Sequence, residues 1–424
     1  MQLVEQHIIK KSSKEYKFID EMSFKSKNLY NSTLYAVRQH YFKTKEYLNY
    51  YSTQKLFQNS KQPDYQSLPS KVSQWVMRMV DQNFKSFFNS IKTYNENHIG
   101  FTGRPKLPNY LNKENGRYLL TFTNQAISKK LLDKQGLLKM SGLDNVLIKT
   151  KLTYDQINQV RIVPRNNSHV IEIIYSIPDK ELKSDNGKYS SIDLGLNNLM
   201  TVSFNDDKPF IINGRPLKSI NHFYNKKLSK FKSCQKNNNK EINKRKIKTL
   251  TNKRNNKVKD YLHKSSRLLV NQLVSKRINT LIIGHNKSWK QDTNMGKINN
   301  QNFVQIPFYS LISMIQYKCQ MEGINVILQE ESYTSKSSFL DRDEIPVYKK
   351  GDKQEIKFSG KRIKRGLYKS KDGRLINADL NGSLNIMRKA VSNVKFTDEI
   401  KVCSTPLINS VPYRNISISQ NQLH

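Results

Sequence analysis

Three acidic residues, far apart in the chain, interrupt segments that are otherwise apolar or helical. Asp193 lies in the run 191–195, Glu331 follows the apolar run 326–328, and Asp379 begins a helical segment. A carboxylate on a buried strand is costly unless it is paired or binds a cation. Mg²⁺ prefers such hard oxygen ligands, and two ions ~4 Å apart can drive in-line cleavage of a phosphodiester. On this interpretation Asp193 bridges two ions, and Glu331 and Asp379 each support one.

Each acid has a simpler explanation when taken alone. Asp379 could cap its helix, Asp193 could be a turn residue, and Glu331 could be a solvated strand end. Glu330 competes with Glu331 for the middle position. Neighbouring residues of a strand face opposite sides of the sheet, so only one of these two can reach the site.

The second half of the chain predicts the elements that would bring the three acids together. After a polar joint at 184–190, the patterns read as three strands, a long basic helical region, a strand, an amphipathic helix, a strand, a Gly- and Lys-rich excursion and a last helix. The three strands are expected near 191–214, the basic helical region at 221–278 and the next strand at 280–285. The amphipathic helix is expected at 307–323, the following strand at 324–332, the excursion at 341–374 and the last helix from Asp379 onwards. This order is typical of an RNase H-like fold, whose sheet places the three acids at one edge.

The first half has a different pattern. A strand is expected at 2–10, helices from about 14 to 97, and several short strands with turns from 117 to 178, which favour a small barrel. The first strand could join that barrel, which makes the helical block an insertion. We therefore expect an α+β multidomain chain: a β-barrel at 1–12 and 100–183, a helical domain at 13–99, an RNase H-like α/β domain at 184–392, and a tail at 393–424 that is loosely ordered.

The net charge of the chain indicates which class of partner it binds. The 424 residues include 73 Lys+Arg and 34 Asp+Glu, a formal net charge of +39, which points to nucleic acid. A basic surface kept for solubility needs less charge, and no stretch approaches the ~20 apolar residues of a membrane span. The N-terminus lacks the pattern of a secretory signal, so we expect a cytoplasmic protein. Cys234, Cys319 and Cys403 form no C-x-x-C pair, which argues against a disulfide framework or zinc knuckle.

Several sequence blocks, taken together, resemble the TnpB family of transposon-encoded, RNA-guided nucleases. This family is also described as OrfB-type transposases and is related to type V CRISPR effectors. The blocks are IDLGLNNLMTVS (192–203), IIGHNKSWKQ (282–291), NQNFVQIP (300–307), EESYTSKSSFLD (330–341) and FSGKRIKRGLYKSKDGRLINADLNGSLNI (358–386). The resemblance extends to the front half through FTGRPKLPNY (101–110) and covers roughly residues 1–390.

The resemblance implies an RNA-guided DNA endonuclease with a wedge barrel, a helical recognition domain and a RuvC-like nuclease domain. Its cofactor would be Mg²⁺, as two ions, and it would cut target DNA beside a short transposon-associated motif. The implied partners are a guide RNA from the transposon end (omega RNA) and double-stranded target DNA, with the protein a monomer or weak dimer in a prokaryotic host, associated with the nucleoid.

Two departures from the family pattern matter. Many members carry the middle glutamate on the strand corresponding to 280–286, where this chain has Gly284, His285 and Asn286. The chain resembles a subgroup in which that glutamate lies before the Tyr-Thr-Ser motif, and Glu331 is in the better register, three residues before Thr334. The family often has a zinc ribbon after this motif, but 341–374 contains no cysteine, so no zinc is expected and a basic loop replaces the ribbon.

Two groups of residues are expected to contact nucleic acid. Between Lys226 and Arg267 there are 16 Lys+Arg and only two acids, which indicates phosphate contacts, although a solvated helix face is the simpler alternative. Base-edge chemistry and position in the family suggest a second group that reads the flanking motif. The phosphate group comprises Lys244, Arg245, Lys246, Lys253, Arg254, Arg267, Lys361, Arg362, Lys364 and Arg365; the motif group comprises Lys71, Gln74, Thr123, Asn124 and Gln125.

Three other functions fit parts of the pattern. A nuclease-inactive repressor guided by RNA would share the basic surface, but the intact trio of acids argues against it. A strand-transfer transposase would share the RNase H-like sheet, although the barrel and helical front half favour guided binding. A plain RNA-binding protein would leave the three acids unexplained.

Overall fold

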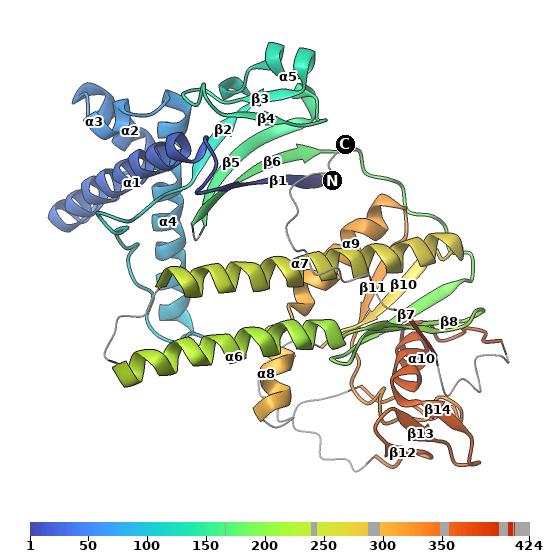
Figure 1. Ribbon diagram of the computed structural model, residues 1–424. Coiled ribbons are helices and arrows are strands. Elements are labelled where there is room, and N and C mark those ends of the chain that lie inside the picture. Colours follow the sequence, from blue (N-terminus) through green and yellow to red (C-terminus); the bar gives the residue numbers. More distant parts are fainter. Residues whose placement is uncertain are drawn as a thin grey trace. The chain divides into compact units, whose positions relative to one another are not determined.

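The computed structural model describes residues 1–165, 167–238, 244–286, 297–347, 356–397, 406–409 and 411 (Figure 1). Of residues 234–238, 244, 297–299 and 302 only the backbone is described. The chain divides into two compact units, Met1–Pro178 and Asp179–His424. Within these described ranges, no helix is long and apolar enough to span a membrane.

The first unit contains a four-stranded antiparallel sheet in the order β1-β6-β5-β2. The strands are β1 (Gln2–Lys10), β6 (Ser168–Ser176), β5 (Ile157–Arg165) and β2 (Leu120–Thr123). The expected closed barrel is not formed by these strands, because β1 and β2 are opposite edges. A barrel needs a continuous ladder; β2 has only four residues, and β3 (Leu137–Lys139) pairs separately with β4 (Leu147–Lys149).

Helices lie between β1 and β2 in the chain and pack into the same hydrophobic core as the sheet. In α4, Val72, Val76, Val80 and Phe84 recur every four residues and are buried, as a helix with one apolar face requires. The helices of this unit are α1 (Tyr16–Thr44), α2 (Tyr50–Asn59), α3 (Pro63–Gln66), α4 (Ser70–Glu96) and α5 (Lys129–Gln135), with short 3₁₀ turns η1 (Asn124–Ala126) and η2 (Tyr154–Gln156).

The second unit is built on a six-stranded mixed sheet in the order β11-β10-β7-β8-β9-β15. β7, β8 and β9 are antiparallel, whereas β10 runs parallel to β7 and to β11. The predicted succession of three strands, helices, strand, helix, strand and final helix is observed. The bounds are β7 (Tyr189–Leu194), β8 (Asn198–Phe204), β9 (Phe210–Asn213), α6 (Arg215–Asn238), α7 (Lys244–Ser275), β10 (Thr280–Gly284), α8 (Lys297–Gln305), α9 (Phe308–Met321), β11 (Asn325–Gln329) and α10 (Ala378–Ala390).

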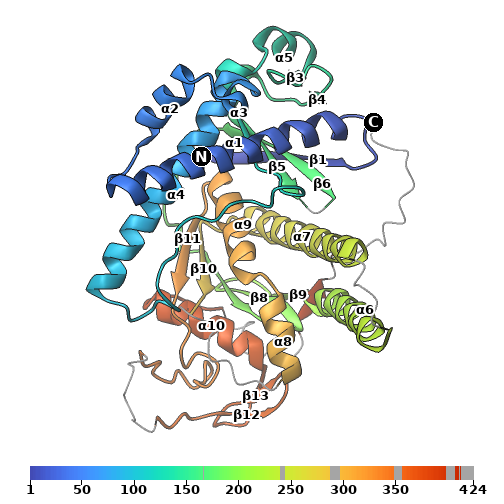
Figure 2. The same ribbon diagram turned by 90° about the vertical axis from the view of Figure 1, so that its left-hand side faces the viewer.

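The two faces of this sheet carry different side chains. Ile192 and Leu194 point into the large core that also contains residues of α7 and α9. Ser191, on the opposite face, is hydrogen-bonded to Ser383 of α10, so Asp193, two residues further along β7, also faces that helix. Figures 1 and 2 show α10 lying against the sheet, in line with its contacts to β7, β8 and β10.

The excursion at 341–374 is less irregular than expected. Residues 348–355 lie outside the described part, but β12 (Lys361–Lys364), β13 (Leu367–Lys369) and β14 (Leu375–Asn377) form a small antiparallel sheet. Gly366, with φ of 86°, supplies the left-handed turn between β12 and β13. Buried Tyr368 donates to the carbonyl of Lys336 at 2.7 Å, which ties this sheet to the Tyr-Thr-Ser segment.

The C-terminal tail is also more ordered than expected over one short stretch. β15 (Leu407–Asn409) pairs in parallel with β9 and covers that edge of the sheet, and Val411 is buried in the main core. The prediction of a loosely ordered tail is therefore wrong for this stretch. Residues 398–405, 410 and 412–424 lie outside the described residues.

Candidate active site

Asp193 lies near the end of β7 where neighbouring residues are small. One step beyond the last parallel pair of β7 and β10, Ile192 with Ile283, the residue beside Asp193 is Gly284. On the other side a Cβ added to Gly382 of α10 would lie 3.0 Å from Asp193 Oδ2. The two glycines therefore leave the space that the Asp193 carboxylate and its neighbours occupy.

Glu331, two residues after the end of β11, extends into the same space. A Cβ added to Gly284 would lie 2.8 Å from Glu331 Oε2. Asn286 holds the glutamate at both ends: its Nδ2 donates to Glu331 Oε1 at 3.3 Å, and its Oδ1 accepts from the Glu331 backbone N–H at 3.2 Å. Gly284 at the end of β10 thus leaves the space for this glutamate, and Asn286, two residues after the strand, supplies the amide that orients it.

Glu330 faces away from Asp193. Its Oε2 accepts from Lys389 Nζ at 2.5 Å and its Oε1 accepts from the Ser332 N–H at 2.7 Å. Burial acts to raise the pKa of Glu330, but these hydrogen bonds outweigh it, and the pKa is lowered. Of the two adjacent glutamates, only Glu331 lies beside Asp193.

Asp379 does not cap its own helix. Asn377 does so, accepting from the backbone N–H groups of Asp379 at 3.0 Å and Leu380 at 3.1 Å. The Asp379 carboxylate instead accepts from Asn198 Nδ2 at 2.7 Å and from Arg362 Nη2 at 3.3 Å. The capping alternative for Asp379 is therefore wrong, and its side chain is available to the cluster.

The three acids form a cluster of like charge. Burial raises the pKa of Asp193 well above its usual range, and the charges of Glu331 and Asp379 raise it further, while Arg362 lowers it. As they stand, no three or more His, Cys, Asp or Glu side chains in the described part of the chain are arranged to hold a metal ion. The acids interact through their charges, with Arg362 as the neighbouring cation.

The donor set nevertheless fits a hard divalent cation. It consists of carboxylate oxygens alone, and glycines rather than side chains flank the carboxylates of Asp193 and Glu331. A guanidinium already lies 3.3 Å from Asp379, so the cluster attracts positive charge.

Sequence reasoning missed the residues that position α10. Buried Asn381 and Asn385, one turn apart, donate to backbone carbonyls of Ser337 and Thr334, and Asn381 Oδ1 accepts from the Phe339 N–H. Together they fasten the Tyr-Thr-Ser segment to the helix. The spacing of two asparagines four residues apart inside an apolar helix was the available signal, because buried amides must be hydrogen-bonded.

A second set of contacts fastens α10 to the sheet. The hydroxyls of Ser191, Ser203 and Ser383 are fully buried and hydrogen-bond to one another, at 2.7 Å between Ser191 and Ser203 and 2.9 Å between Ser203 and Ser383. These small residues let the helix approach β7 and β8 closely. Ser191 is two residues before Asp193 on β7, and Ser383 is one turn after Asp379 on α10.

The residues predicted to contact phosphates fall into two groups. Arg254 is engaged within the protein, donating to Asn221 Oδ1 at 2.8 Å and to the Gln305 carbonyl at 2.6 Å. Arg362 lies at the acid cluster, and Arg267 lies 3.7 Å from Glu322. Exposed positions are Arg245, Lys246 and Lys253 on α7 and Lys361, Lys364 and Arg365 on the small sheet. The Lys244 side chain lies outside the described residues.

The residues predicted to read a flanking motif lie on two elements of the first unit that pack together, α4 and the β2–η1 segment. Lys71 and Gln125 are exposed and Gln74 is half-buried. Thr123 Oγ1 and Asn124 Oδ1 are buried, and among the residues described here they have no hydrogen-bond partner.

Both family models that match this chain fall almost entirely within the second unit. Residues 172–290 match the family OrfB_IS605, described as a probable transposase, and residues 308–386 match the Cas12f1-like TNB domain. The resemblance to the TnpB family is confirmed. In this TnpB-like chain the first match contains Asp193 and the second contains Glu331 and Asp379. No curated protein matches it in sequence.

Solved structures of small CRISPR effectors are similar to the TnpB-like chain. The structure of a Cas12f1–sgRNA–target DNA complex has 14% identity, covers 87% of this chain and 81% of that chain, and has a TM-score of 0.50. A CRISPR-Cas12f ternary complex has 14% identity, covers 89% of this chain and 82% of that chain, and has a TM-score of 0.36. The mini-RNA-guided endonuclease CRISPR-Cas_phi3 has 9% identity, covers 96% of this chain and 93% of that chain, and has a TM-score of 0.41. The first of these likenesses establishes a shared mixed α/β fold.

Proposed function

We propose that this protein is an RNA-guided DNA endonuclease that cuts target DNA beside a short flanking motif. The observation that carries the proposal is that Asp193, Glu331 and Asp379, from three distant segments, meet on one face of the second unit's sheet. The two family matches support the same class, because the acids fall inside the matched segments. The net charge of +39 suits an RNA guide and a DNA target together.

In this proposal the carboxylates of Asp193, Glu331 and Asp379 would hold two Mg²⁺ ions. The bound ions would supply activation of the attacking water and stabilisation of the leaving oxygen. Asn286 and Asn198 orient Glu331 and Asp379. Arg362, once released from Asp379, is placed to contact a phosphate of the strand being cut.

Sequence would be read mainly by pairing between guide and target, as in other RNA-guided effectors. The flanking motif would be read by Lys71 and Gln125, which are exposed, with Gln74 beside them. Thr123 and Asn124 would take part only after a local rearrangement that exposes their buried oxygens.

A single reconstitution tests the proposal. The protein is expressed with the RNA of its flanking locus, and the complex is offered matched double-stranded DNA beside a randomised flank, with and without Mg²⁺. Cleavage that requires both RNA and Mg²⁺ supports an endonuclease. RNA-dependent binding without cleavage indicates a repressor instead. Joined DNA products formed without RNA indicate the strand-transfer activity that the description "probable transposase" suggests.

A further inference from the structure

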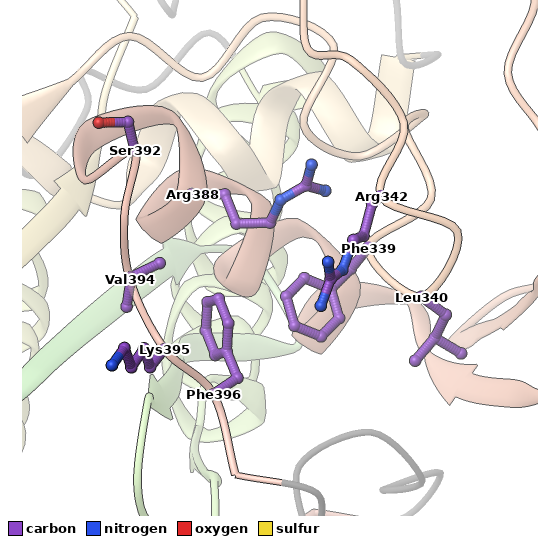
Figure 3. A pocket seen from close by; sticks show the side chains of 8 residues that line it. All are labelled: Phe339, Leu340, Arg342, Arg388, Ser392, Val394, Lys395 and Phe396. Carbon is purple, nitrogen blue, oxygen red and sulfur yellow. The ribbon is translucent and has the colours of Figure 1, made fainter.

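A cavity of about 530 Å³ lies at the other end of α10 from Asp379. Arg388, which lines it, is nine residues beyond Asp379 on the same helix, a separation of roughly 14 Å at 1.5 Å per residue. The cavity is therefore distinct from the acid cluster. It is formed between the end of α10, the turn around 339–342 and the segment 392–396 (Figure 3).

The described residues that line this cavity include three cations, Arg342, Arg388 and Lys395, and no carboxylate. Arg388 is half-buried and donates to two neutral oxygens, Asn385 Oδ1 at 3.2 Å and the Asp343 carbonyl at 3.1 Å. Burial lowers the pKa of Arg388, the nearby charge of Arg342 lowers it further, and the charge of Asp343 raises it. Two guanidinium groups thus line one cavity, and the nearby Asp343 carboxylate, which is not among its lining residues, accepts from the backbone N–H groups of Ser338 and Ser359.

The backbone around Arg342 is held in an uncommon conformation. Its φ is 56°, in the left-handed region that residues with a side chain rarely adopt. Its N–H donates to the Phe339 carbonyl at 3.2 Å, and the Asp343 N–H donates to the Ser338 carbonyl at 3.1 Å, so a tight turn keeps it there. Such strain, where it persists, often belongs to a functional position.

The other walls are apolar. Phe339 and Phe396 meet edge to face with ring centroids 4.9 Å apart, and Leu340 and Val394 continue the surface. A bare inorganic anion would leave these walls and most of the volume unused. A planar group attached to the anion would contact the apolar walls and fill the remaining volume, since aromatic side chains and guanidinium planes stack on bases.

We propose that this cavity binds a nucleotide, with its phosphate on Arg342 and Arg388 and its base against the apolar wall. A volume of this size is usual for small-ligand sites, and guanidinium forks are suited to phosphate. The nucleotide can be free or can be one residue of a DNA strand, since both present the same chemistry. The site does not depend on the activity of the acid cluster.

The test is equilibrium binding to the full chain at a salt concentration that screens exposed charges. The probes are AMP, adenosine, inorganic phosphate and a short oligothymidylate. Arg342→Gly removes one guanidinium, and its left-handed backbone suits glycine, so the variant should melt no lower than the wild type. Arg388→Gln is the second variant. Lys208→Gln is the matched control, because Lys208 is exposed on the same unit and is not among the residues that line the cavity.

A free-nucleotide site predicts saturable AMP binding that both arginine variants weaken about tenfold or more, with adenosine binding much more weakly. A strand site predicts the same loss for oligothymidylate, with little binding of AMP alone. Either result supports the proposal that the cavity binds a nucleotide. Equal affinities of Arg342→Gly, Arg388→Gln and Lys208→Gln for both probes would overturn the proposal, and so would inorganic phosphate binding as tightly as the nucleotides.

Discussion

Two clusters of ionisable side chains, one in each unit, are organised in opposite ways. In the first unit Arg117 donates to both carboxylate oxygens of Asp20, at 3.0 and 2.7 Å, and His169 Nε2 lies 3.2 Å from Asp20 Oδ1. Burial acts to raise the pKa of Asp20, but these partners lower it overall. In the second unit, burial and two more acids raise the pKa of Asp193.

We infer from this difference that the Asp20 cluster is structural, whereas the Asp193 cluster is a candidate functional site. Asp20 joins α1 to the 111–119 segment and to β6, and its charge is matched within the protein. The charge of Asp193 is matched only in part, by Arg362 at its edge. A buried acid whose pKa is strongly perturbed by neighbouring charges is a candidate for a functional site. The two clusters should therefore respond differently when each is altered.

The largest effect is expected for Asp193→Asn. If the acids hold Mg²⁺, cleavage of guided target DNA should fall about a thousandfold, because a metal ion contributes several kcal/mol at a phosphoryl centre. Binding of RNA and target should remain close to that of the wild type. The melting temperature without divalent ions should be unchanged or higher, since repulsion is relieved. A large loss of stability would place Asp193 in the structural class with Asp20.

The two adjacent glutamates give a matched pair. Glu331→Gln should lower the cleavage rate about a hundredfold, because it removes one carboxylate of the cluster. Glu330→Gln should keep the rate within a few-fold and instead lower the melting temperature slightly, since Lys389, 8% exposed, loses its charged partner. Single-turnover cleavage and thermal melting measure the two effects. If Glu330→Gln lost cleavage and Glu331→Gln kept it, Glu330 rather than Glu331 would be the middle carboxylate of the cluster.

Disrupting the Asp20 cluster, whose charge is matched within the protein, should destabilise the fold without lowering cleavage activity. Asp20→Asn should lower the free energy of unfolding by about 2 kcal/mol, the usual scale for hydrogen bonds to charged groups. Glu21→Gln is the control, because its pair with Lys25 is exposed. Denaturant unfolding measures both. An Asp20→Asn protein as stable as the control would mean that the cluster is not structural.

The smallest effect is a dependence of stability on pH. Burial lowers the pKa of His169 below 6.5, despite Asp20. Stability from a neutral buried histidine is present above pH 6.5 and is lost as the pH falls, because the unfolded chain then binds the proton more readily. His169→Gln should make the loss of stability between about pH 7 and 5 smaller than in the wild type. Melting temperatures across that range test this, and an unchanged slope would contradict it.

Much of the second unit could be predicted from the sequence. Apolar runs of period two and helical spacing determine strands and helices locally, and the order of those elements implied a sheet with the three acids at one edge. The excess of Lys and Arg indicated a polyanionic partner without any knowledge of the fold. The blocks shared with TnpB proteins pointed to the same family as the later comparisons.

The tertiary structure determined which side chains from distant parts of the chain lie together. Alternation along a strand shows that Glu330 and Glu331 diverge, but only the position of Lys389 shows which of them faces Asp193. Likewise Asn377, not Asp379, caps α10, and a short strand from the tail covers β9. The cavity around Arg342 and Arg388 joins residues 46 positions apart. Local propensity cannot specify such contacts, because they depend on which distant side chains share a space once the chain has packed.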